Sequence, residues 1–362
     1  LASVLGDIIE ITPTHVENYY KCPFMYFLNG VLRVRPLEKA EFGRRIAGDY
    51  MHFIAQRVLE KYGRDYPLQP WENIEKDIDG AVKEFLEKNY PREIYNNVKF
   101  TSQYRNMREN AGRFMKYIYF EQASSSFKPI AYELRIGGKG KVPPLTVTTE
   151  RGNRVNIAGI CDRVDVYRGE EKDYLRVVDY KTGSRNFSLD RIYNGLSMQM
   201  LIYMYVLIRQ QFAKKDNPVL PGGVVYQHSD ADAYFDKSET EAKLYGADGM
   251  ALAEEEICRA FDKNERGEYG VIKNDKGKIK KLPGSEAVSR EKFGAVLEYV
   301  KDAVQKMGDG IYGGTFEDMP LAEKREDTGI ACKYCNYKSV CLNTNKKKVM
   351  EKRQFDREEK NG

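Results

Sequence analysis

The sequence predicts an α/β fold in which a large helical part precedes a core of strands and helices. Up to about residue 126, apolar side chains recur at the three- and four-residue spacings of amphipathic helices. From about residue 129, short segments alternate or run apolar over strand lengths, with Gly and Pro between them. Residues 194–212 are apolar almost all round, as in a buried helix. Strands separated by helices are typical of α/β domains.

The helical part, residues 11–126, is expected to contain three main helices. Their boundaries follow from the apolar spacing and from breaks at Pro67, Pro70 and Pro91. The expected helices are 38–62, 72–90 and 103–124.

The core, residues 127–228, is expected to contain most of the strands. They are read from the segments PIAYELRI, PLTVTTE, RVNIAGICDRVDVYR, DYLRVVDYK and PGGVVYQHS. The apolar helix at 194–212 comes before the last of these strands. This order of strands and one buried helix predicts a sheet covered by helices.

The remainder of the chain is more polar. Residues 229–290 are expected to form an insertion, with helical pieces near 248–262. A helix near 286–308 follows, and residues 291–345 are expected to hold a C-terminal helix and a cysteine cluster. No internal repeat is evident, and the length allows one large domain or two ordinary ones; we expect residues 1–362 to form a single domain.

Composition narrows the class of protein. Charged residues make up 31% and hydrophobic residues 41%, which is ordinary for a soluble chain. The net charge of +5 permits an anionic partner but does not require one. No apolar run approaches the ~20 residues that span a bilayer, and no signal peptide is evident, so we expect a cytoplasmic protein without a membrane partner. The chain starts at Leu1 rather than Met, and we expect it to be a fragment of a longer protein.

Two predicted strands each carry an aspartate on an otherwise apolar face. Residues two apart in a strand share a face, so Asp179 and Lys181 align with Val177, and Asp162 aligns with Val164. A buried carboxylate needs compensation, and two carboxylates from neighbouring strands commonly bind Mg²⁺. The pattern therefore predicts a Mg²⁺ or Mn²⁺ site with Lys181 beside a polarised water and a phosphate. The alternative is a buried Asp179–Lys181 ion pair.

These strands carry a family resemblance. The segment GICDRVD followed by VVDYKTG resembles the RecB-like branch of the PD-(D/E)XK nuclease superfamily, which adds a helix bearing Q-x-x-x-Y. Gln199 and Tyr203, in QMLIY, match that motif on one helical face, although Gln199 alone could instead bond to a neighbouring backbone. The resemblance implies a restriction-endonuclease-like core with a central mixed sheet flanked by helices. It also implies catalytic roles for Asp162, Asp179 and Lys181, together with Gln199 and Tyr203.

Two residues upstream complete the resemblance. Glu133, in AYELRI, matches the acidic residue that the family carries on the preceding strand, and is assigned to the catalytic set. His52, in GDYMHFIAQRVLE, matches a helical histidine that RecB-like members use as a further metal ligand. The implied metal ligands are therefore His52, Asp162 and Asp179. Taken singly, a helical histidine is more often structural and a strand glutamate more often solvated.

Four cysteines form a second pattern. Three thiols have the spacing C-x₂-C-x₅-C, at Cys332, Cys335 and Cys341, and Cys22 lies near the start of the chain. This set could hold zinc or an iron–sulfur cluster, and the spacing does not choose between them. The resemblance to AddB-type and CRISPR-associated RecB-like nucleases implies a [4Fe–4S] cluster that staples the chain ends together, with zinc as the lesser candidate. Cys161 and Cys258 are expected in core packing.

The function implied by the resemblance is metal-dependent hydrolysis of DNA phosphodiester bonds. The chain resembles the nuclease domains of AddB-type subunits, which act with an AddA-type helicase partner in DNA repair and recombination at double-strand breaks. DNA, as single-stranded ends, is the implied substrate, and exonuclease action the implied mode. No G-x-x-x-x-G-K-[ST] motif is present, so ATP hydrolysis through a P-loop is not expected of this chain. The alternatives are a stand-alone CRISPR-adaptation or phage-type exonuclease, and an inactive DNA-binding module with a structural cluster.

Overall fold

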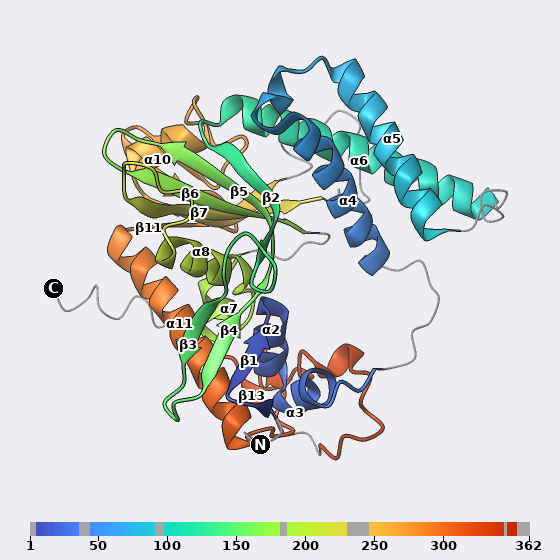
Figure 1. The fold of residues 1–362 in the computed structure, drawn as a ribbon, viewed down its shortest axis with the longest axis vertical. Coiled ribbons are helices and arrows are strands. Elements are labelled where there is room, and N and C mark those ends of the chain that lie inside the picture. Colours follow the sequence, from blue (N-terminus) through green and yellow to red (C-terminus); the bar gives the residue numbers. More distant parts are fainter. Residues whose placement is uncertain are drawn as a thin grey trace.

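A six-stranded mixed sheet lies at the centre of the protein (Figure 1). The computed structural model describes residues 5–35, 44–90, 98–181, 187–229, 246–343 and 346–352. The strand order is β11-β8-β7-β6-β5-β2. Pairs β6–β7 and β8–β11 are parallel and the other pairs antiparallel, so the expected mixed sheet is confirmed. The strands are β2 (Lys128–Ile136), β5 (Gly159–Arg168), β6 (Asp173–Lys181), β7 (Val219–His228), β8 (Ala247–Leu252) and β11 (Glu286–Val288).

Helices cover both faces of this sheet. On one face α8 (Gln199–Arg209) packs against β6 and β7, and α11 (Arg290–Gly313) packs on α8 (Figure 1). Residues 200–207 of α8 are all buried, which explains why its sequence is apolar almost all round. The helix expected at 194–212 covers only 199–209. The residues just before it form a turn after α7 (Leu189–Tyr193), in which Gly195 has a φ of +79°.

The helical part contains the three expected helices. They are α4 (Arg44–Tyr62), α5 (Trp71–Asn89) and α6 (Val98–Ser124), while positions 38–43 lie outside the described residues. Helix α5 buries Ile74, Ile78, Val82 and Phe85, at helical spacing, against its neighbours. Shorter helices precede and join them: α2 (Pro13–Lys21), α3 (Pro23–Tyr26), a π-helix (Phe27–Val31) and a 3₁₀-helix (Gly63–Leu68). Among the described helices, none combines the length and the apolarity that crossing a lipid bilayer requires.

The long strand expected in RVNIAGICDRVDVYR is instead two strands in different sheets. β4 (Arg154–Ile157) pairs with β1 (Ile8–Ile11) and with β3 (Leu145–Thr148), whereas β5 joins the central sheet. The chain changes sheets at Ala158, whose N–H donates to the Ile11 carbonyl, 2.9 Å away. Gly159 follows with a φ of +158°, which side chains rarely adopt.

The stretch after β7 also differs from expectation. Residues 247–252, where helical pieces were expected, form β8 between β7 and β11, and only α10 (Glu255–Phe261) is helical. Only glycine fits at position 249 of this strand, because a Cβ there would lie 2.0 Å from the Val224 carbonyl oxygen on the neighbouring strand. A two-stranded antiparallel hairpin follows, made of β9 (Ile272–Asp275) and β10 (Lys278–Lys281). Positions 230–245 of the expected insertion lie outside the described residues.

The two ends of the described chain meet below the sheet (Figure 1). The N–H of Phe24 donates to the Glu317 carbonyl at 3.2 Å, and the Tyr337 hydroxyl donates to the Val34 carbonyl at 2.7 Å. The C-terminal segment adds a 3₁₀-helix (Cys332–Tyr334) and two short parallel strands, β12 (Leu321–Ala322) and β13 (Lys348–Val349). The cysteine segments are therefore neighbours in space, although some three hundred residues separate them in sequence.

A buried network of four charged side chains lies between the sheet and α6. Arg163 Nη2 lies 2.9 Å from Glu121 Oε2, and Arg176 Nη2 lies 2.6 Å from Glu121 Oε1 and 2.7 Å from Asp165 Oδ2. All four side chains are at least 98% buried. Burial alone would raise the pKa of Glu121, but the two guanidinium groups lower it below its usual range. The network thus fixes α6, β5 and β6 relative to one another.

We expect Glu121→Ala to destabilise the fold by about 3–5 kcal/mol, because it leaves two buried guanidinium groups facing one carboxylate. Denaturant unfolding measures this loss. The matched control is Glu298→Ala, which removes an exposed partner of Arg209 and should cost less than about 1 kcal/mol. Equal unfolding midpoints for the two variants would contradict the expectation.

Candidate active site

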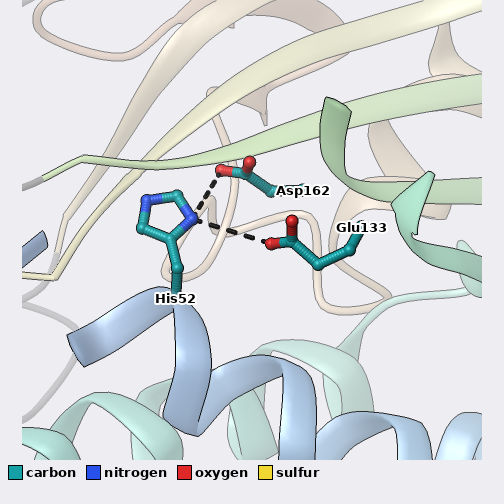
Figure 2. Close-up of side chains that lie close together, drawn as sticks. All are labelled: His52, Glu133 and Asp162. Atoms are coloured by element: carbon teal, nitrogen blue, oxygen red, sulfur yellow. Dashed lines mark ion pairs between the residues drawn. The ribbon is translucent and has the colours of Figure 1, made fainter. Parts of the chain in front are cut away.

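Three of the predicted site residues meet at one end of the sheet (Figure 2). His52 projects from α4, and its Nδ1 lies 3.4 Å from Asp162 Oδ2 on β5 and 3.8 Å from Glu133 Oε1 on β2. One ligand atom from each of the three residues lies within 4.8 Å of the others, and no second such group occurs in the part of the chain that the structure describes. An imidazole nitrogen and two carboxylates are thus brought together from three separate elements.

An irregularity in β2 determines where Glu133 points. The register between β2 and β5 shifts by one residue between Pro129 and Ala131, and this brings Glu133 opposite Asp162. A one-residue shift exchanges the faces of a strand. Glu133 also has a φ of +44°, a left-handed backbone that is uncommon for glutamate and that gathers at functional sites. The bulge and this conformation together turn the Glu133 carboxylate toward His52.

The two residues of the D-Y-K strand stand beside this group. Asp179 is almost fully buried, whereas the Lys181 side chain remains 41% exposed with its Nζ 2.8 Å from Asp179 Oδ2. Lys181 Nζ also donates to Gln199 Oε1, 3.0 Å away at the start of α8. Gln199 therefore holds the lysine ammonium rather than a neighbouring backbone. The anticipated alternative, an Asp179–Lys181 ion pair, is present, and it leaves the Lys181 side chain partly exposed.

Tyr203 lies one helical turn beyond Gln199 and packs on the start of β5. A Cβ at Gly159 would lie 2.6 Å from the Tyr203 hydroxyl oxygen, so only glycine fits beside this ring. The hydroxyl is hydrogen-bonded to the backbone of Ile160, and burial raises the pKa of Tyr203. Tyr203 therefore positions the strand that carries Asp162, two residues further along.

Burial and the neighbouring charges together shift the pKa values of the site. Burial and then the neighbouring Asp179 raise the pKa of Asp162 to about 7, against the lowering effects of His52 and of the Tyr180 N–H that donates to Asp162 Oδ2 at 2.8 Å. Burial lowers the pKa of His52, but the Glu133 carboxylate 3.8 Å away and the charges of Asp162 and Asp179 outweigh it and raise the value to about 9. Without a bound cation, Asp162 and His52 therefore keep their protons at pH values at which they would lose them in the unfolded chain.

We expect the metal-free protein to lose stability as the pH rises from about 4 to about 9. Asp162 holds its proton up to about pH 7 when folded and to about 3.8 when unfolded, and His52 to about 9 against 6.5. The folded state thus binds more protons in this range, so the free energy of unfolding falls with pH. Thermal unfolding in a chelator measures the slope. Asp162→Asn, which keeps the acceptor for Tyr180, should flatten it, and an unchanged slope would contradict this assignment.

The residues fit a divalent cation. Asp179 Oδ2 is buried without a hydrogen-bond donor in suitable geometry, because the Lys181 ammonium approaches it outside hydrogen-bond angles. Buried oxygens without donors are costly, and a cation offsets that cost. Carboxylates suit Mg²⁺ and Mn²⁺, while the imidazole of His52 favours Mn²⁺ among the two. A cation at this place would be held by His52, Glu133, Asp162 and Asp179.

One acidic residue near the site was not predicted from the sequence. Glu17 on α2 acts on Lys181: burial lowers the pKa of Lys181, but Asp179, then Asp162 and Glu17, raise it above its ordinary value. Glu17 also forms an i,i+4 ion pair with Lys21, 2.7 Å apart. In the sequence, a Glu–Lys pair at i,i+4 spacing is typical of an exposed helix face, so it does not indicate that Glu17 lies near a site. Only the packing of α2 against α8 brings it near the site.

The four predicted cluster cysteines lie in the region where the chain ends meet. Cys22 is buried between α2 and α3, and burial raises the pKa of its thiol. The N–H groups of Met25 and Phe24 lower that pKa, and the nearby thiols of Cys332 and Cys335 raise it. Cys332 in turn interacts with Cys335 and Cys341. All four thiols are thus electrostatically linked, whereas Cys161 and Cys258 are buried in the core, as expected.

Comparison with known proteins gives a consistent family. The family model of the PD-(D/E)XK nuclease superfamily matches residues 10–342. Proteins named as the B subunit of ATP-dependent helicase/deoxyribonuclease are similar over most of this chain. The one from Acetivibrio thermocellus is 28% identical over 94% of this chain and 30% of its own length, and the one from Clostridium novyi is 28% identical over 94% and 31%.

A third relative of the same name, from Thermoanaerobacter sp., is 26% identical over 92% of this chain and 30% of its own length. The chain thus spans about a third of the length of these relatives. The resemblance to the PD-(D/E)XK superfamily, predicted from GICDRVD and VVDYKTG, and the resemblance to AddB-type subunits, given with the cysteine pattern, are both confirmed, and the mixed sheet with flanking helices fits the PD-(D/E)XK fold. Since the family model covers most of the sequence, the chain belongs to the PD-(D/E)XK nuclease superfamily.

Proposed function

We propose that this chain is a Mg²⁺- or Mn²⁺-dependent deoxyribonuclease that hydrolyses phosphodiester bonds. The observation that carries the proposal is the convergence of His52, Glu133 and Asp162 within 4.8 Å, beside the buried Asp179. Among the described residues, Lys181 is the one side-chain cation other than His52 that pairs with these carboxylates. A divalent cation would complete the site, and the exposed ammonium would face the substrate.

Each residue has a distinct part in the proposed reaction. A divalent cation, when bound, supplies Lewis-acid polarisation of a phosphate oxygen and of a water molecule. The Lys181 ammonium, held by Asp179 and Gln199, lies where negative charge develops on the phosphate and stabilises it. Gln199 keeps the ammonium in place, and Tyr203 keeps Asp162 in place through the start of β5. Glu133 and His52 supply the ligand groups that come from β2 and α4.

The names of the relatives support a wider setting. They are described as subunits of an ATP-dependent helicase/deoxyribonuclease, so we propose that this chain is the nuclease domain of such an assembly. Its partner would be an AddA-type helicase subunit, and its substrate DNA ends at double-strand breaks, degraded exonucleolytically as single strands. A stand-alone CRISPR-adaptation or phage-type exonuclease is the second candidate, since the same metal-binding residues and the same cysteines would serve it.

A cleavage assay on end-labelled DNA tests the proposed activity. Linear single-stranded, linear double-stranded and covalently closed circular DNA are incubated with Mg²⁺, with Mn²⁺ and with a chelator. We expect cleavage of linear DNA only with a cation, and little cleavage of closed circles. No cleavage under any condition, together with unimpaired DNA binding, would support the inactive DNA-binding module instead.

We also propose that Cys22, Cys332, Cys335 and Cys341 bind a [4Fe–4S] cluster. The support is electrostatic interaction among the four thiols and N–H groups directed at two of the sulfurs. Tyr337 N–H lies 3.4 Å from Cys335 Sγ, and the N–H groups of Phe24 and Met25 face Cys22. Hydrogen bonds to sulfur are typical around such clusters and favour the thiolate form. Zinc is the competing occupant, since thiolates bind both.

We expect Cys22→Ser to destabilise the whole domain, because it removes the ligand that ties residues near 22 to those near 335. Anaerobically prepared protein should be brown and contain iron and sulfide, measured by absorption and metal analysis. DNA binding should weaken in the variant, while the site at Asp162 and Asp179 keeps its chemistry. Stoichiometric zinc without iron would overturn the iron–sulfur assignment, and a fully stable Cys22→Ser protein free of metal would overturn the staple.

A further inference from the structure

The hairpin of β9 and β10 presents a dense group of lysines to solvent. The segment IKNDKGKIKK, residues 272–281, contains five lysines and a single acidic residue. Lys276, Lys278, Lys280 and Lys281 are exposed, while Ile272 is buried and anchors the hairpin to the body. Lys280 pairs with Asp275 and Lys281 pairs with Glu286, at 2.6 and 3.1 Å. The hairpin lies outside the candidate active site, and neither the sequence motifs nor the proposed reaction gives it a role.

The hairpin is rigid enough to form a defined surface. Its two-residue turn, Lys276–Gly277, has φ values of +55° and +81°, the left-handed pair that closes a tight β-hairpin. The side chain of Asn274 accepts from the Gly277 N–H at 2.9 Å, and its amide donates to Glu265 Oε2 at 2.6 Å. The segment is therefore held by hydrogen bonds within itself and to the preceding loop.

A concavity of about 530 Å³ lies between this hairpin and the loop that precedes it. Three cations line it: Arg266, Lys273 and Lys276. Two carboxylates, Glu265 and Asp275, also line it, but both are already engaged. Glu265 accepts from Arg259 at 2.7 Å and from Asn274, and Asp275 lies 2.6 Å from Lys280. Within the described ranges, no carboxylate comes within ion-pair distance of the three lining cations, so the concavity offers net positive charge.

We propose that the three cations of this concavity, together with the exposed Lys278 of the hairpin, bind the phosphate backbone of DNA, away from the point of cleavage. Free lysine and arginine side chains on one rigid surface are the usual means of binding phosphates without reading sequence. The choice of DNA as the polyanion rests on the proposed function, whereas the surface itself follows from the unpaired cations.

The position of the hairpin makes it a second place of attachment for DNA. The unit to which it belongs is tied to the start of β2, because Phe127 N–H donates to the carbonyl of Ala260 on α10. Glu133 lies on β2, six residues after Phe127, roughly 20 Å along it at the rise of a strand. The unit that carries the hairpin is thus attached at the start of the strand that carries Glu133 further along, and the hairpin and the candidate active site are separate places on the protein.

The test is DNA binding by a protein that cannot cut. In an Asp179→Asn background, the charges of the concavity are removed by Arg266→Gln, Lys273→Gln and Lys276→Gln together. The matched control removes three exposed cations elsewhere, by Lys83→Gln, Lys214→Gln and Lys215→Gln. Fluorescence anisotropy with labelled single-stranded and duplex oligonucleotides gives Kd over a range of salt concentrations. Thermal unfolding verifies that both triple variants remain folded.

We expect the hairpin variant to bind at least about tenfold more weakly at low salt. The slope of log Kd against log salt should be smaller by about 2–3, at roughly 0.9 for each phosphate that the protein no longer neutralises. The control should keep the parent slope to within about 1, the change that a single phosphate would cause. The same Kd and slope in both triple variants would overturn the inference. So would binding of inorganic phosphate or a mononucleotide, by calorimetry, that is lost in the hairpin variant while its DNA affinity stays unchanged.

Failure of this inference and failure of the proposed function give different results. If the unmodified protein cuts DNA and the hairpin variant binds like its parent, the nuclease assignment stands and the DNA-binding hairpin falls. If the unmodified protein cuts nothing but the hairpin variant loses DNA affinity, the hairpin inference stands alone. In the active background, the hairpin variant should keep the turnover number at saturating DNA and raise KM.

Discussion

Replacing Asp179 by alanine should reduce DNA cleavage by about a thousandfold or more while leaving the fold intact. Asp179 is a buried carboxylate with an oxygen that has no hydrogen-bond donor in suitable geometry, and we assign that oxygen to the cation. Loss of a ligand removes Lewis-acid assistance worth several kcal/mol, and each ~1.4 kcal/mol is a factor of ten in rate. Single-turnover cleavage at saturating Mg²⁺ measures the effect.

The fold should survive Asp179→Ala because the substitution also relieves repulsion. The neighbouring Asp179 charge helps raise the pKa of Asp162, so its removal lowers the cost of ionising Asp162 in the metal-free protein. The half-exposed Lys181 can hydrate once its partner is gone. Asp302→Ala, on the exposed face of α11, is the matched control and should cleave like the parent. Parent-like cleavage by Asp179→Ala would show that the site is assigned to the wrong residues.

Replacing Lys181 by alanine should lower turnover by about a hundred- to a thousandfold and leave metal affinity nearly unchanged. The ammonium contacts Asp179 and Gln199 on a partly exposed side chain, so we expect it to act on phosphate and water, not on the cation. Turnover from cleavage kinetics and Mn²⁺ affinity from calorimetry separate the two effects.

Two controls define the role of Lys181. Lys181→Arg keeps the charge but changes its shape, and we expect partial activity. Gln199→Ala removes the group that holds the ammonium and should lower turnover less than Lys181→Ala does. If Lys181→Ala instead lost metal affinity and kept full turnover at saturating metal, Lys181 would be a structural partner of Asp179, as in the simple ion-pair interpretation.

The residues of the candidate site could be singled out in the sequence because they stand in short motifs. Strand alternation puts each aspartate in line with the apolar face of its own strand, and the register of the adjacent G-x-x-D and D-Y-K strands then brings Asp162 opposite Asp179. Gln199 could be tied to Lys181 only through the family resemblance, since nothing local indicates which strand α8 covers. The helix–strand packing that brings His52 to Asp162 likewise depends on the tertiary fold.

Features that arise from backbone irregularity or from long-range packing were not predictable. The bulge near Ile130 and the left-handed Glu133 leave no mark in an apolar segment such as PIAYELRI. The break at Gly159 is hidden within a run that reads as one strand. Residues 247–252 contain a glycine and few β-branched side chains, so their strand depends on burial between two neighbours.

The buried charge network could not be predicted from the sequence either. Arg163 and Arg176 occupy strand positions that alternate with apolar ones, which in a single sequence is typical of a solvated face. Only α6, folding over that face with Glu121, makes these positions interior. A helix that supplies one carboxylate from about forty residues away leaves no local signal.

The central claim is that one divalent cation binds among His52, Glu133, Asp162 and Asp179. Anomalous X-ray scattering from crystals soaked in Mn²⁺ tests it most directly, because the signal locates the metal without reference to activity. We predict a single strong anomalous peak within ligand distance of His52 Nδ1 and of the Asp162 and Asp179 carboxylates, absent in Asp179→Ala crystals. A protein that cleaves DNA with Mn²⁺ in solution, yet shows its only anomalous peak away from these four residues, would contradict the account.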